Sequence, residues 1–98
     1  MASSFKSAIF LIESRMAEAA NGDGDACYEL GMVYSTGSGG VDIDLVQAHK
    51  WFNLAALAGN VRGHESRAEI AWDMTAREIA EAQRQARDWL GSTQRRAA

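Results

Sequence analysis

The chain has 98 residues, one cysteine and no proline, and its formal net charge is −3. This length suits a single domain over residues 1–98, and the absence of proline beside abundant alanine, arginine and glutamate favours long helices, so we expect an all-α fold. The net negative charge argues against a broad attraction to nucleic acid or to an anionic membrane.

Two further features limit the class of protein. A lone cysteine, Cys27, excludes an intramolecular disulfide and a cysteine metal cluster. The apolar run near the N-terminus covers only residues 8–12 before Glu13 interrupts it. Such a run is too short for a secretory core or a membrane span. We therefore expect a cytoplasmic protein that makes no membrane contact.

The first helix is predicted from about Ser4 to Ala20. Its apolar residues recur at the spacing of one helical face, and they are Phe5, Ile9, Ile12, Met16 and Ala19. Asn21-Gly22 ends this helix, because glycine readily takes the left-handed conformation found after a helix C-terminus. We expect residues 1–21 to form a capping helix at the N-terminal end of the fold.

Two helices follow, separated by a glycine-rich turn. The second begins at Asp23 or Asp25, either of which can cap free backbone amides, and continues to about Ser35. Residues 36–40, Thr-Gly-Ser-Gly-Gly, cannot continue it. The third helix starts after the cap Asp44 and ends at Gly59. The core positions expected on these two helices are Ala26, Leu30, Val33, Tyr34, Leu45, Ala48, Trp51, Phe52 and Ala55.

The last two helices meet at the sharpest local boundary in the sequence. The fourth helix is predicted from about Arg62 to Asp73. Residues 75–78, Thr-Ala-Arg-Glu, then form a capping box, in which Thr75 and Glu78 bond each other's backbone amides. The fifth helix runs from there to Gly91, and residues 92–98 are expected to be a flexible tail.

The chain contains an internal repeat. The pattern Gln-Ala-x-x-Trp starts at Gln47 and again at Gln85, 38 positions later, and Gly22 and Gly59 lie 37 positions apart. Periods of this size are typical of stacked helical units that bury their apolar faces against one another. Short connections make neighbouring helices antiparallel. We predict a short α-solenoid of about five antiparallel helices, with hairpins at residues 22–58 and 59–91.

A set of small and aromatic residues recurs in a fixed order along the repeat. Its members are Leu30, Gly31, Tyr34, Gly37, Gly39, Ala48, Trp51, Ala55, Ala56, Gly59 and, in the second unit, Trp89. This order resembles the Sel-one-like repeat (SLR) family, a relative of the tetratricopeptide repeat (TPR). The first unit departs from the family pattern by one extra residue near Gly40 and by Asp42 in place of proline. The second unit is degenerate, with Arg67 where leucine is expected. The resemblance implies an α/α superhelix that contacts proteins and is not an enzyme.

Residues that could carry chemistry have simpler explanations. Ser3-x-x-Lys6 matches a hydrolase nucleophile pattern, but the other elements of that machinery are missing, so a small hydrolase is only a remote alternative. His49 and His64 lie on different helices and are expected to be solvated rather than metal ligands. The arginines of the fifth helix alternate with acids, which predicts a salt-bridged face rather than a nucleic-acid site. We expect no cofactor and no metal.

The candidate binding surface lies on the first helices of the two hairpins. If Leu30 and Tyr34 face the core, the opposite face of the second helix points outward, and the repeat shift carries that face onto the fourth helix. The predicted partner-binding residues are Tyr28, Glu29, Met32, Glu65, Glu69 and Trp72. This apolar strip with acidic neighbours suits a basic or amphipathic protein segment. A simpler interpretation is that Trp72 folds over the fifth helix and seals the core.

A second function hypothesis is self-association. Up to Asn60 the chain has three basic and seven acidic residues, and from Val61 onward it has seven arginines and six acidic residues. Opposite ends of a short solenoid could then stack head to tail into a homo-oligomer.

Overall fold

The fold is all-α, as predicted. A computed structural model describes the backbone of residues 2–97 and the side chains of residues 7–94. The helices are α1 (Ala2–Ala20), α2 (Gly24–Thr36), α3 (Leu45–Leu57), α4 (Val61–Ala71) and α5 (Ala76–Ala97), with a short 3₁₀ turn, η1 (Ser38–Gly40). No strand occurs among residues 2–97. The side chains of Ser3, Phe5 and Lys6 and those of the last four residues lie outside the described part.

Polar side chains set the starts of three helices. Asp23 accepts hydrogen bonds from the amides of Asp25 and Ala26, Asp44 accepts one from Gln47, and Asn60 accepts one from Gly63. Each cap satisfies an amide that the first helical turn leaves without a partner. The predicted starts of α2 and α3 are therefore confirmed to within a residue.

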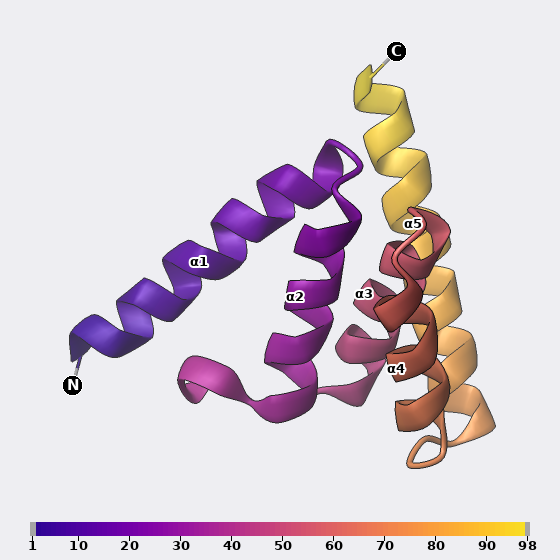
Figure 1. The fold of residues 1–98 in the computed structure, drawn as a ribbon, viewed down its shortest axis with the longest axis horizontal. Coiled ribbons are helices and arrows are strands. Elements are labelled where there is room, and N and C mark those ends of the chain that lie inside the picture. Colours follow the sequence, from indigo (N-terminus) through magenta and orange to yellow (C-terminus); the bar gives the residue numbers. More distant parts are fainter. Residues whose placement is uncertain (1, 98) are drawn as a thin grey trace.

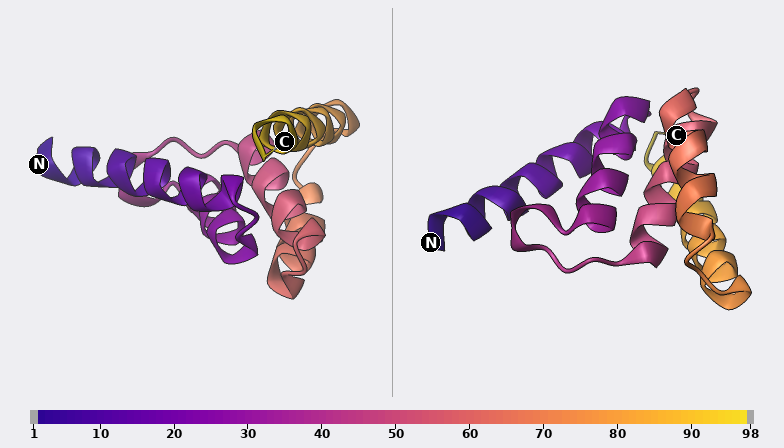
Figure 2. Two further views of the ribbon diagram at one scale, coloured as in Figure 1. Left: turned by 90° about the horizontal axis from the view of Figure 1, so that it is seen from above. Right: turned by 60° about the horizontal axis from the view of Figure 1, so that its bottom comes forward.

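Helix α3 is the central element of the molecule (Figures 1 and 2). It packs against α2, α4 and α5, whereas α1 packs against α2 and η1. Helices α4 and α5 make few contacts with each other, which differs from the second hairpin expected from the repeat. The reason lies in α4, where only Gly63 is buried and Arg67 bonds to Asn53 of α3. Helix α4 therefore packs on α3 and not on α5.

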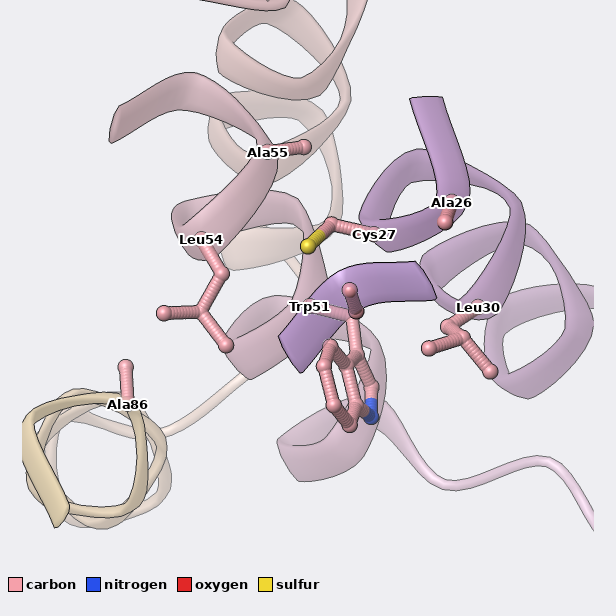
Figure 3. Close-up of a cluster of buried hydrophobic side chains, with 8 residues drawn as sticks. Ala26, Cys27, Leu30, Trp51, Leu54, Ala55 and Ala86 are labelled. Carbon is pink, nitrogen blue, oxygen red and sulfur yellow. The ribbon is translucent and has the colours of Figure 1, made fainter. Parts of the chain in front are cut away.

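The core is built around two large aromatic side chains. Trp51 and Phe52 of α3 are fully buried together with Leu30 of α2. The Trp51 ring meets the Trp89 ring of α5 edge-on, with the centroids 4.9 Å apart. Figure 3 shows the cluster that surrounds Trp51, whose buried members are Ala19, Ala26, Cys27, Leu30, Trp51, Leu54, Ala55 and Ala86. The predicted burial of Trp51 is confirmed.

Small residues let the helices approach closely. A Cβ atom placed on Gly31 would lie 2.4 Å from the Phe52 ring, and one on Gly63 would lie 2.6 Å from the Cβ of Ala55. Both distances are shorter than any normal contact between carbon atoms. Glycine at these two positions therefore sets the distances of α2 and α4 from α3.

Helix α5 continues to Ala97, past the end predicted at Gly91. A single glycine in a helix costs about 1 kcal/mol relative to alanine, which a long helix tolerates. Nothing that follows Gly91 stops the helix, and the Thr93 hydroxyl donates back to the carbonyl of Trp89 at 3.0 Å. No helix in the described part of the chain combines the length and the apolarity that a membrane crossing requires.

Candidate functional site

A groove lies between α2 and α4, the first helices of the two predicted units. Its volume is about 290 Å³, and Phe52 of α3 contributes to its lining. The groove is lined by Met32, Ser35, Phe52, Ser66, Glu69, Ile70 and Asp73. We call it the α2–α4 groove. It combines an apolar base with carboxylates and hydroxyls, a combination suited to binding an amphipathic segment.

Two of the six predicted partner-binding residues line this groove. Met32 comes from α2 and is exposed, and Glu69 comes from α4. Asp73, which lies just beyond the end of α4, also lines the groove. Glu65 is exposed on α4 and does not line the groove. Glu69 and Asp73 form no ion pair with any residue between 7 and 94. The groove is therefore negatively charged.

Tyr28 is half-buried. Its ring centroid lies 5.7 Å from that of Phe52, and the guanidinium of Arg62 lies 4.7 Å above the Tyr28 ring. A cation over an aromatic face is attracted by the ring's quadrupole. Arg62 therefore covers the face of Tyr28, and no sequence signal links these two residues, which lie 34 positions apart.

Glu29 is directed toward α1. Its carboxylate forms an ion pair with Arg15, which also bonds to Glu18 at 2.9 Å. Glu29 and Arg15 are both partly exposed to water, so this ion pair adds little stability. It links α1 to α2, and it leaves Glu29 outside the α2–α4 groove.

Trp72 is the most exposed large apolar side chain in the described part of the chain. It follows directly on the end of α4, and 89% of its surface is accessible. The interpretation in which Trp72 seals the core over α5 is therefore wrong. Trp72 lies at the C-terminus of a short helix that does not pack on α5, so it has no surface to cover.

The two histidines differ in their exposure to water. His49 is buried, with 3% of its surface exposed, which corrects the expectation that it is solvated. The reason is that α3 has neighbours on three sides, so few of its positions reach water. His64 is exposed and lies 3.0 Å from a guanidinium nitrogen of Arg67. Among the described residues, no group of three or more His, Cys, Asp or Glu is placed to hold a metal ion.

Cys27 is a core residue. Burial, with a smaller contribution from Asp23, raises the pKa of its thiol to about 11. The thiol is therefore protonated at neutral pH and is a poor nucleophile.

The salt-bridged face expected on α5 is present in part. Arg84 forms ion pairs with Glu81 and, at 2.6 Å, with Asp88. Arg77 and Arg87 form no ion pair with any residue between 7 and 94.

Comparison with known proteins agrees with the predicted repeat. Residues 24–60 match the family model described as Sel1 repeat. No curated protein and no solved structure matches the chain. The matched segment begins with α2 and ends at the cap of α4, so it covers the first predicted hairpin. Repeats of this family generally mediate contacts between proteins.

Proposed function

Because residues 24–60 match the Sel1 repeat model, we propose that this chain is a non-enzymatic adaptor that binds a peptide or helix of a protein partner in the α2–α4 groove. One observation carries the proposal. The exposed Trp72 stands at the end of α4, the helix that forms one wall of an acidic groove. Large exposed apolar side chains beside a groove are typical of contact sites, and tryptophan is enriched among residues that dominate binding.

The charge of the groove selects the partner. Glu69 and Asp73 line the groove and form no ion pair with a cation among the described residues, so a segment rich in lysine or arginine complements them. Met32 and Ile70 offer an apolar surface for the partner's anchor side chain. The proposal places this adaptor in the cytoplasm, where the thiol of Cys27 stays reduced.

A capture experiment tests the groove. The purified chain is immobilised and mixed with lysate of its source organism, and bound proteins are crosslinked and identified by mass spectrometry. Trp72→Ala should reduce capture of the specific partner by about tenfold, as expected for a residue that dominates binding. Leu57→Ala is the matched control, because Leu57 is an exposed apolar residue at the end of α3, whereas Trp72 directly follows α4, one wall of the groove.

The outcomes separate the groove from other surfaces. Loss with Trp72→Ala but not with Leu57→Ala, together with crosslinks near α4, supports the proposal. Equal capture by both variants in folded protein contradicts it.

A further inference from the structure

A second cleft lies at the opposite side of the repeat. Figure 1 shows that α1 diverges from α2 toward its N-terminus and that the segment after α2 turns back toward α1. The cleft between them has a volume of about 550 Å³. Its walls are residues of α1, Tyr34 of α2 and residues 40–44. We call it the α1 cleft.

The apolar surface of the α1 cleft is partly open to water. Ile12 of α1 is half-buried inside it, whereas Ile9 is 40% exposed and Ile43 is 63% exposed. Phe10 and Leu11 extend the apolar surface of α1 beyond the cleft. Apolar residues gathered around a concave site usually mark a contact surface.

The cleft is held open by contacts on both sides. The amide of Asp44 donates to the carbonyl of Tyr34 at 2.9 Å, which fixes the loop to α2. On the other side, a Cβ atom at Gly39 would lie 2.7 Å from the Cβ of Ala8, so the glycine allows the turn to touch α1. A site whose walls are already in place loses less conformational entropy when a ligand binds.

The rim of the α1 cleft is acidic. Glu13, Asp42 and Asp44 line it, and no lysine, arginine or histidine does. Within the described part of the chain, no cation forms an ion pair with these three carboxylates.

We propose that the α1 cleft is a second docking site, which accepts a basic segment of a partner protein. An aliphatic or aromatic side chain of that segment packs against Ile12, Ile43 and Tyr34. Flanking lysine or arginine side chains lie beside the carboxylates of Glu13 and Asp42. The Tyr34 hydroxyl has no hydrogen-bond partner among residues 7–94, so it is available to bond the segment's backbone. This site is separate from the α2–α4 groove and does not depend on it.

The test uses the full chain and a defined probe. The probe is a fluorescein-labelled synthetic peptide of leucine, alanine and lysine arranged as an amphipathic helix, and its binding is followed by fluorescence anisotropy. Ile43→Ser should weaken binding by about tenfold. Asp42→Asn and Glu13→Gln, which keep the side-chain shapes, should each weaken it by about two- to fivefold. The same peptide with glutamate in place of lysine should not bind.

A matched control removes general electrostatic attraction. Asp88→Asn removes one negative charge, as Asp42→Asn does, at an exposed position on α5 that lines neither the α1 cleft nor the α2–α4 groove, and it should leave the affinity of the probe unchanged. NMR spectra of the isoleucine methyl groups should show shifts at Ile9, Ile12 and Ile43 when the probe binds. Circular dichroism checks that each variant is folded.

Three outcomes would overturn the proposal. The first is an equal loss of affinity with Asp88→Asn and with Asp42→Asn, which would indicate unspecific attraction. The second is a set of NMR shifts confined to the α2–α4 groove. The third is self-association in light scattering that Ile43→Ser abolishes, because the α1 cleft would then be an interface between copies of this chain.

Discussion

At the scale of single residues, His49 makes stability depend on pH. Burial, and secondly the charge of Arg67, lowers the pKa of His49 from its ordinary value of about 6.5. The unfolded chain then binds a proton more readily than the folded one. The free energy of unfolding should be constant above about pH 6.5 on this account and should fall as the pH drops from there toward the folded-state pKa.

Urea denaturation at several pH values between about 5.5 and 7.5, a range of about one pKa standard deviation on each side of the ordinary histidine value, checks this prediction. His49→Met should remove most of the pH dependence, because methionine fills the site without a titrating group. His64→Gln is the control, since His64 is exposed, and it should retain the dependence. If the free energy of unfolding of His49→Met still falls steeply as the pH drops, another group causes the pH dependence.

Gly31 lies directly against the ring of Phe52. Gly31→Ala places a methyl group against the Phe52 ring, so we expect a loss of about 1–3 kcal/mol in the free energy of unfolding. Phe52→Leu should relieve part of this overlap. The double variant should therefore be more stable than the sum of the two single changes predicts, and strict additivity in urea denaturation would contradict the contact.

At the scale of helices, the capping box before α5 is confirmed. The Thr75 amide donates to the Glu78 carboxylate at 2.8 Å, and the Glu78 amide donates to the Thr75 hydroxyl at 3.1 Å. Thr75→Ala should lower the free energy of unfolding by about 1 kcal/mol. Thr75→Ser keeps the hydroxyl and should change it by only a few tenths. Equal denaturation midpoints for Thr75→Ala and the unchanged chain would contradict the role of the cap.

The same helices show what the sequence predicts and what it does not. Caps such as Asp44 and Thr75 are local, because their bonds reach two or three residues, so they could be recognised from the sequence. The packing of α4 was not local. It depends on Arg67 bonding to α3, and a repeat shift cannot indicate which neighbour a polar side chain selects.

The candidate site, too, could be predicted from the sequence only in part. The periodicity of α2 correctly placed Met32 on an outward face beside Glu69 of α4, and the groove between these helices follows from that placement. Contacts across long stretches of chain changed the surroundings of other residues. Arg62 covers Tyr28, and Arg15 pairs with Glu29, although neither basic residue lies near its partner in the sequence. Such partners depend on helix orientation, which hydrophobic periodicity leaves undetermined.

At the scale of the whole molecule, stability rests on the single core around α3. Helices α2, α4 and α5 each pack on α3, and Trp51 joins α3 to both α2 and α5 through Leu30 and Trp89. Helix α5 lacks extensive contacts with α4, so removing the Trp51 ring also removes much of what holds α5 to the rest. Trp51→Ala should therefore lower the free energy of unfolding by about 3–5 kcal/mol.

Trp72 provides a matched comparison within the same chain. Trp72→Ala deletes an identical side chain at a position that is 89% exposed, so it should change the free energy of unfolding by no more than about 0.5 kcal/mol. Thermal unfolding followed by circular dichroism measures both variants. A large loss with Trp72→Ala would mean that Trp72 packs on the fold, and the α2–α4 groove would then lose its proposed anchor. A small loss, together with the weakened capture expected for Trp72→Ala, would separate the residue that binds from the residue that holds the helices together.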